Sequence, residues 1–388
     1  MTSPAISHNP LINERIATIG VFLANGFGIG AWAVEVPRIK ESLSLSDASL
    51  GIALFCFALG AIVAMPLAGQ LAPRVGSGRA TALFGAAFAI GLPLPALAPG
   101  MLTLCVALFA LGASNGVLDV SMNGHASAIE TQWRAPIMSS FHAAWSTGGL
   151  LGAATGAMLQ KNGVGVFGGL LVPDLLIATL IALAALLALR DIGPRAPAAS
   201  SGFVWPDSAV MKLAMLAFLC MLVEGAVADW SAVYLRSTLN QEASVAAIGY
   251  SAFALSMAAC RVAGDASVRR FGSSRVVALG GLIALAGLAL VLSLPAVWSA
   301  CVGFAMVGVG LANIVPVIFS AAGRSTATPA VGVSMAATAG YAGFLVGPPL
   351  IGFGAGLLGL RSALWLLAMA TLIVSLLGGN AVRNARLA

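Results

Sequence analysis

Long apolar blocks separated by short polar loops run along almost the whole chain. Each block holds roughly 20 residues, the length of an α-helix that crosses the hydrocarbon core of a bilayer. The blocks do not alternate apolar and polar residues, as the strands of about 10 residues in a membrane β-barrel do. The pattern predicts twelve membrane-spanning helices, over residues 15–37, 46–68, 80–98, 101–124, 136–160, 166–189, 209–235, 244–267, 276–294, 297–320, 329–356 and 361–382.

Composition favours a lipid environment for these helices. Hydrophobic residues make up 60% of the 388 residues and charged residues only 8%, whereas a soluble domain carries about 25% charged residues. In hydrocarbon every backbone N–H and C=O needs a partner within the protein, and a helix supplies one for each. We therefore predict an all-α membrane protein.

Neither a cofactor nor a metal site is predicted. Each cysteine lies in an apolar block, without metal-ligand spacing, so we interpret all five as small core residues: Cys56, Cys105, Cys220, Cys260 and Cys301. The start, Met1 to Asn13, is polar and precedes a block long enough to span, so we expect no cleavable signal.

The net charge of +6 reflects orientation in the membrane and does not require nucleic-acid binding. Most Arg and Lys residues fall in alternate loops, which lie on one side of the bilayer if the twelve spans are correct. The positive-inside rule then places both termini in the cytoplasm. We expect a multi-pass protein of the bacterial inner membrane.

The two halves of the chain repeat each other. A Pro- and Ser-rich linker, 191–208, separates a predicted N-terminal six-helix bundle, 1–190, from a C-terminal six-helix bundle, 209–388. At an offset of 196 residues, identical residues pair as Phe57 with Phe253, Arg74 with Arg270, Gly76 with Gly272, Arg79 with Arg275 and Gly112 with Gly308, while Trp145 falls on Tyr341. Two such bundles, related by a pseudo-two-fold axis along the membrane normal, are typical of one large transporter fold.

One loop resembles a known signature. Residues Gly69 to Arg79, with the sequence GQLAPRVGSGR, lie between the second and third blocks. They resemble the loop 2–3 signature of the major facilitator superfamily, and Gly264 to Arg275 is a weaker copy. Gly69, Arg74, Gly76 and Arg79 match the signature. Pro73 stands where the family has Asp, so the family's carboxylate interaction does not carry over from this position.

A second stretch is more specific. Gly112 to Asn123, with the sequence GASNGVLDVSMN, leads to Met138 to Gly149, MSSFHAAWSTGG. These residues are similar to the fucose-permease-type and YbjJ-like branches of the superfamily. The likeness implies a proton-coupled solute carrier. The fifth block lacks the G-P-x-x-G-G-like string of proton-coupled drug exporters, although Gly347 to Gly352 in the eleventh block is similar, so uptake is slightly favoured over export.

Rare acids in apolar helices are the candidates for proton coupling, since charge at membrane depth is costly. Asn115, Asp119 and Asn123 share one face of the fourth helix. If the hairpin turns near Glu130, His142 of the fifth helix lies at the depth of Asp119. The two would then either pass a proton or form a structural hydrogen-bonded pair.

Further polar residues extend the predicted cavity. Glu224 lies deep in the seventh helix and needs a partner on another helix or a proton. Glu35, with Trp32 and Asn25 on the same face, either lines the cavity or pairs with Arg38 at the membrane interface. The remaining cavity candidates are Trp145, Asn313 and Tyr341.

The inner ends of the helices carry a candidate gate. Arg261 and Asp265 form an i, i+4 pair in the eighth helix. Together with the loop arginines Arg74, Arg79 and Arg270 they would join the halves when the transporter opens outward. The alternative is that the loop arginines only set topology.

These patterns predict a monomeric secondary transporter that moves a small solute, together with protons, by alternating access. A proton-driven exporter of lipophilic compounds is the alternative. An intramembrane enzyme is disfavoured, because Ser140 and His142 lack the G-x-S-x-G context of a nucleophile. ATP hydrolysis is disfavoured too, because no G-x-x-x-x-G-K-[ST] string occurs.

Overall fold

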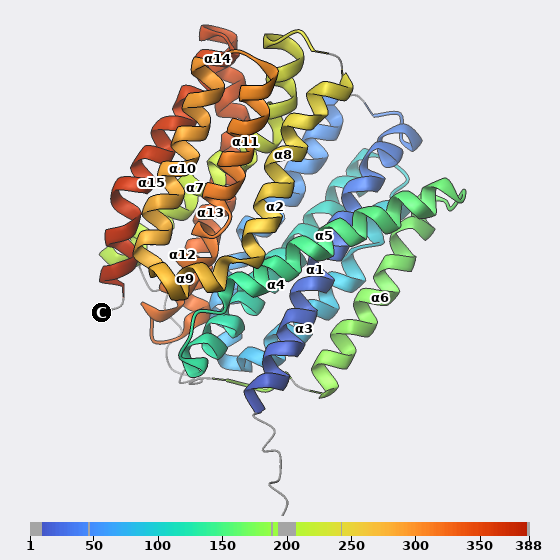
Figure 1. Cartoon of the computed structure of the whole chain (residues 1–388). Helices are drawn as coiled ribbons and strands as arrows, with labels where there is room; N and C mark the ends of the chain where they lie inside the picture. Colours follow the sequence, from blue (N-terminus) through green and yellow to red (C-terminus); the bar gives the residue numbers. More distant parts are fainter. Residues whose placement is uncertain (1–9, 46, 188, 193–206, 242, 386–388) are drawn as a thin grey trace, which may run out of the picture.

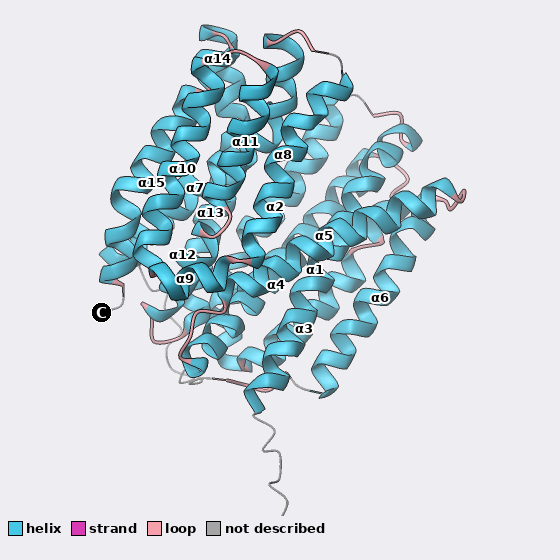
Figure 2. Ribbon diagram, viewed as in Figure 1, coloured by secondary structure: helices cyan, strands magenta, loops and turns pink. Residues whose placement is uncertain are grey.

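Helices make up nearly the whole protein (Figures 1 and 2). The computed structural model describes residues 10–45, 47–187, 189–192, 207–241 and 243–385. The N-terminal half consists of α1 (Pro10–Ser42), α2 (Asp47–Val75), α3 (Ser77–Gly91), the 3-10 turn η1 (Leu94–Leu97), α4 (Met101–Trp133), α5 (Met138–Lys161) and α6 (Val166–Leu187).

The C-terminal half contains more breaks. It consists of α7 (Ser208–Val233), the π-helical turn η2 (Tyr234–Thr238), α8 (Ala243–Val262), α9 (Gly264–Phe271), α10 (Ser273–Ser293), α11 (Val297–Leu311), α12 (Ile314–Arg324), α13 (Pro329–Leu358), α14 (Leu360–Ala363) and α15 (Trp365–Asn384).

Length and hydropathy identify 10 candidate spans among the described residues, the pair α11–α12 counting as one. The two further crossings are α8, of which Ile248–Val262 is a shorter apolar stretch, and α5, whose 24 residues include several serines and His142. The predicted fold class, twelve helices in two six-helix bundles, is confirmed.

Several predicted spans differ from the structure in their ends, and three of these differences bear on the site. The fourth helix extends beyond residue 124 to Trp133, because its polar end, including His125 and Glu130, is buried by neighbouring helices. The eighth block stops at Val262 and continues as the short helix α9. The tenth block breaks between α11 and α12 at Asn313, whose amide donates to the carbonyl of Cys260 at 3.1 Å.

The predicted internal repeat is visible in the packing. Gly112 of α4 lies against the Phe57 carbonyl of α2, and Gly308 of α11 lies against the Phe253 carbonyl of α8, with no room for a Cβ at either glycine. The corresponding loops repeat as well, since Gly76 and Gly272 both have positive φ, 106° and 81°. The pseudo-symmetry therefore extends from sequence to helix crossings.

Each bundle has its own apolar core. One core is built from residues between Ala17 and Leu189. The other is built from residues between Leu213 and Ala385, joined by four residues of α2 and α4: Ala61, Met65, Ala68 and Val120. The domain boundaries 1–190, 191–208 and 209–388 stay a prediction, and most of the linker lies outside the described residues.

The start of α1 and the end of α15 lie at the same end of the molecule, the lower end in Figure 1. We call this end, which includes the start of α1 and the end of α15, the terminal face. Because successive helices run in opposite directions, the loops after α2 and α4 also lie there.

Candidate functional site

A chain of hydrogen bonds crosses the middle of the protein. The indole Nε1 of Trp145 on α5 donates to Asn25 Oδ1 on α1 at 2.8 Å, and Asn25 Nδ2 donates to Asn115 Oδ1 on α4 at 2.8 Å. Asn115 Nδ2 makes a longer contact of 3.5 Å with the hydroxyl of Tyr341 on α13. Four predicted cavity residues are thus brought together, and the last contact joins the two bundles.

A second group surrounds Asp119 of α4. Asn123 Nδ2 donates to Asp119 Oδ1 at 3.2 Å, and Asn123 Oδ1 lies 3.1 Å from His142 Nε2. The other carboxylate oxygen, Asp119 Oδ2, is buried without a hydrogen-bond partner in the described part of the chain. A lone carboxylate oxygen away from water is costly, and a proton or a donor group of a solute would relieve that cost.

The predicted direct partnership of Asp119 and His142 is corrected to a bridged one. The hairpin turns after Trp133 rather than near Glu130. His142, in the second turn of α5, therefore lies nearer the terminal face than Asp119, and Asn123 connects the two. The His142 ring lies between Phe22 of α1, at a centroid distance of 5.6 Å, and Phe319 of α12, at 6.0 Å.

Glu224 forms an ion pair with a residue of another helix, Arg261. Arg261 Nη2 of α8 lies 3.4 Å from Glu224 Oε1 of α7. The same guanidinium donates from Nη1 to Ser146 Oγ of α5 at 2.8 Å and from Nε to the carbonyl of Ala312 at 3.3 Å. Arg261 thus joins three helices, one of them in the opposite bundle.

The predicted pair of Arg261 and Asp265 is replaced by other contacts. Asp265 lies in the separate helix α9, where its Oδ1 accepts the backbone N–H of Ser140 at 3.1 Å. Its Oδ2 lies 3.8 Å from Arg15 Nη2 of α1. The break after α8 turns Asp265 away from Arg261 and toward the N-terminal bundle.

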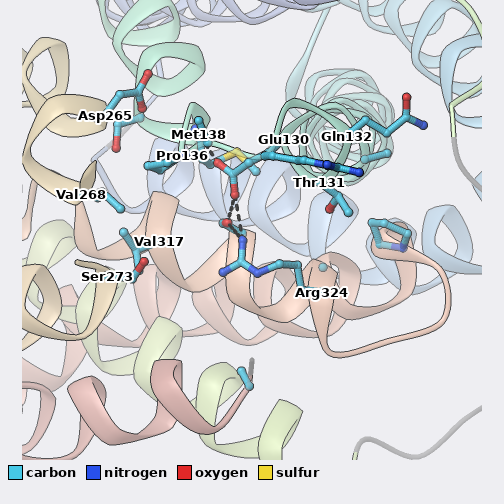
Figure 3. Close-up of a pocket in the computed structure, with 18 of the residues that line it drawn as sticks. Glu130, Thr131, Gln132, Pro136, Met138, Asp265, Val268, Ser273, Val317 and Arg324 are labelled. Carbon is cyan, nitrogen blue, oxygen red and sulfur yellow. Dashed lines mark hydrogen bonds and ion pairs between the residues drawn. The ribbon is translucent and has the colours of Figure 1, made fainter. Parts of the chain in front are cut away.

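Glu130 makes an ion pair between the bundles (Figure 3). Its Oε2 accepts the backbone N–H groups of Ile137 and Met138, both at 2.9 Å, at the start of α5. Its Oε1 accepts from Arg324 Nη1 of α12 at 2.8 Å and also from Ser320. The carboxylate caps one helix and binds the opposite bundle at once.

A cavity of about 760 Å³ opens beside this contact. Its wall includes Glu130, Ser139, Asp265 and Arg324, so it lies at the terminal face between the bundles (Figure 3). The described polar contacts between bundles all lie at mid-depth or toward this face. The bundles are therefore closed against each other there.

Glu35 and Trp32 lie apart from the central site. Glu35 is fully buried and pairs with Arg38 at 3.0 Å, while Gln160 of α5 donates to it at 3.3 Å. Trp32 is also buried. Of the two alternatives for Glu35, the contacts favour the pair with Arg38, at the end of α1 opposite the terminal face.

The loop signature contributes backbone contacts rather than a cluster of arginines. Gly69 packs closely on Ser334 of α13, which donates to the Met65 carbonyl at 2.8 Å. Arg74 and Arg270 are exposed, and the Arg270 guanidinium lies 5.5 Å from the centroid of the Phe271 ring, a cation–π contact. Arg79 pairs with Asp191 at 3.7 Å.

Several residues of the site were not singled out by the sequence patterns. Glu130, Arg15 and Arg324 lie near predicted loops, where charged residues are common and carry no signal of pairing. Asp174 lies within α6 with one buried oxygen unpartnered among the described residues. Its place in an apolar helix is a signal that could have identified it. No cluster of three or more His, Cys, Asp or Glu residues suited to a metal ion occurs in the described ranges.

A helical membrane protein with two similar halves and a polar site where they meet has the architecture of a secondary transporter. The family model described as Major Facilitator Superfamily matches residues 18–341. The chain belongs to the major facilitator superfamily and is a secondary transporter of small solutes.

Relatives and solved structures agree. The chain is 36% identical over 367 residues to an uncharacterized MFS-type transporter of Yersinia pestis, covering 94% of this chain and 95% of the relative. It is 34% identical over 354 residues to the membrane protein MosC of Rhizobium meliloti, covering 91% and 86%. The transporter FucP in its outward conformation superposes with a TM-score of 0.80 at 16% identity, covering 97% of this chain and 99% of that one.

Proposed function

We propose that the protein couples the movement of a small organic solute to protons, with Asp119 as the proton-binding group. The observation that carries this proposal is the buried Asp119 Oδ2, which has no hydrogen-bond partner in the described part of the chain. An ionised carboxylate in this position is unfavourable, and protonation removes the charge. One structural neighbour, the Fucose:proton symporter FucP of E. coli, supports proton coupling and a sugar-like solute.

The surrounding residues have separate roles in this proposal. Asn123 orients Asp119 and His142, and the chain from Trp145 to Tyr341 forms a polar wall beside them. Arg261 is already bonded to Glu224 and Ser146, so it offers no free cation to an anionic solute. We therefore favour a neutral, hydroxyl-bearing solute, taken up rather than exported.

The proposal also includes the oligomeric state, the membrane and the orientation of the protein. We propose a monomer in the inner membrane, and the distribution of Arg and Lys supports an orientation with the terminal face toward the cytoplasm. The closed terminal face then corresponds to a state that is sealed on the cytoplasmic side. Export of lipophilic compounds stays the second candidate, on the similarity of Gly347 to Gly352 to the exporter string.

The test is transport by Asp119→Asn in proteoliposomes with an imposed pH gradient, using a panel of sugars and polyols. We expect gradient-driven uptake to be lost while exchange of solute across the membrane persists, because Asn cannot release a proton at this position. Asp174→Asn is the matched control, since Asp174 is also a buried acid in a span with an unpartnered oxygen. Gradient-driven uptake that survives in Asp119→Asn would exclude Asp119 from coupling.

A further inference from the structure

The first residues after α6 are docked on the N-terminal bundle. The backbone N–H of Arg190 donates to both carboxylate oxygens of Glu14, at 3.1 and 2.9 Å. Two residues on, the backbone N–H of Ile192 donates to Ser77 Oγ at 3.0 Å, and Ser77 Oγ donates to the Ile192 carbonyl at 3.0 Å. We call residues 190–192 the strap.

Buried side chains support the strap from below. His125 of α4 is fully buried, and its Nδ1 lies 2.9 Å from Ser77 Oγ. Because the single Ser77 hydrogen goes to the Ile192 carbonyl, His125 Nδ1 is the donor in this contact. Ser77 is then satisfied as a donor and twice as an acceptor, which fixes the strap at one position over the loop after α2.

Asp191, in the middle of the strap, faces the loop 2–3 signature. Its Oδ1 accepts the backbone N–H of Arg79 at 3.2 Å, in the first turn of α3, and its Oδ2 lies 3.7 Å from Arg79 Nε. A carboxylate at the start of a helix is favourable, because the first N–H groups lack partners within the helix.

Two glycines of the signature make room for this contact. A Cβ at Gly76, where φ is 106°, would collide with the Asp191 carboxylate, and a Cβ at Gly78 would collide with the Arg190 carbonyl. At Gly272, the counterpart of Gly76 in the other half, a Cβ would meet nothing within 4 Å. The described strap is therefore specific to the N-terminal half.

The strap also reaches the boundary between the bundles. Asp191, Pro73 and His125 line one small cavity, whose opposite wall is Thr328 to Ala330 at the start of α13. Close by, Gly124 of α4 packs directly against Ala330. A carboxylate at residue 73 and one at residue 191 would thus face the same space.

We propose that Asp191 is a positioning residue that supplies, from the linker, the carboxylate that Pro73 removes from the loop 2–3 signature, and so holds the loop in the position that closes against α13. This inference rests on transport by alternating access, but it requires neither proton coupling nor a particular solute. Without the Asp191 charge, the start of α3 loses its acceptor and Arg79 its partner. The loop then relaxes and the terminal face opens more often.

The test measures how fast a cysteine at Ala330 reacts with a maleimide in purified protein whose five native cysteines have been replaced. Ala330 is buried at the closed boundary, so labelling reports opening. Asp191→Asn should raise the labelling rate at least several-fold. Adding Pro73→Asp to that variant should return the rate to within about twofold of the starting protein, because it restores a carboxylate beside the loop.

The matched control is Asp207→Asn, at the other end of the linker. Asp207 also caps a helix, accepting from the backbone N–H groups of Ala209 and Val210, but we expect no change in labelling there. Equal labelling of Asp191→Asn and the starting protein, failure of Pro73→Asp to rescue, or an equal effect of Asp207→Asn would each overturn the proposal.

A second variant, which changes no charge, tests the strap even if Asp191→Asn fails to fold. Gly78→Ala should displace the strap and raise labelling as well, and unchanged labelling would count against the strap. Because labelling needs neither solute nor pH gradient, its outcome is separate from the outcome of the Asp119 experiment. Loss of proton coupling in Asp119→Asn, together with unchanged labelling in Asp191→Asn, would reject this inference while leaving the proposed function standing.

Discussion

Arg324 of α12 donates a hydrogen bond of 2.8 Å to Glu130 of α4, across the boundary between the two bundles. The Glu130 side chain is 6% exposed and that of Arg324 is 26% exposed. The pair is thus shielded on one side and open to the terminal cavity on the other. Because the ion pair joins the two bundles, it stabilises the closed terminal face directly.

Arg324→Gln should weaken the contact between the bundles at the terminal face. The variant removes a charge-assisted hydrogen bond, which contributes about 1.5–3 kcal/mol, although partial exposure of Arg324 reduces the effect. We expect faster labelling of a cysteine at Ser139, which lines the terminal cavity. Arg134→Gln is the control, since Arg134 lines the same cavity; an equal increase there would show a general charge effect.

Asn123→Leu should uncouple Asp119 from His142. The side chain is fully buried and joins the two groups, and an apolar replacement leaves both without that partner. Gradient-driven uptake should fall roughly tenfold or more, which corresponds to about 1.4 kcal/mol. Asn162→Leu is the control, because each amide donates to the backbone carbonyl four residues earlier, Asn123 to Asp119 and Asn162 to Met158, but Asn162 is exposed. Full uptake by Asn123→Leu would contradict the bridging role.

Arg261→Met should destabilise the protein more than the double variant Arg261→Met with Glu224→Gln. Arg261 is 7% exposed and Glu224 19% exposed, so the single change leaves a largely buried, unpaired carboxylate, at a cost of about 3 kcal/mol. The double change removes that charge and should recover most of the loss. Thermal unfolding in detergent measures both, and equal melting temperatures would show that the pair does not couple.

Gly112→Ala and Gly308→Ala should destabilise by similar amounts, because both glycines lie against a carbonyl of the neighbouring helix. Forcing a methyl group into such a contact costs about 1–3 kcal/mol. Gly20→Ala, where a Cβ meets nothing within 4 Å, should instead be neutral or stabilise by up to about 1 kcal/mol. Chemical unfolding compares the three, and a mild effect at only one of the paired glycines would contradict equivalent crossings.

The sequence by itself determined the helical class, the twelve crossings and the repeat. Blocks of apolar residues long enough to span leave the backbone few alternatives in lipid, and the glycines at an offset of 196 mark the same crossing in each half. It also indicated which polar residues face the centre: Asn115, Asp119 and Asn123 share a face because of helical spacing alone.

Only the tertiary structure decided the partners of those residues. Helical spacing fixes the direction of a side chain but neither the rotation and depth of the neighbouring helix nor the site of a break. Because α4 continues to Trp133, Asn123 lies between Asp119 and His142. Because α8 ends at Val262, Asp265 contacts Ser140, while Arg261 pairs with Glu224. Contacts between residues more than 100 positions apart depend on how the bundles dock, and no local pattern encodes that.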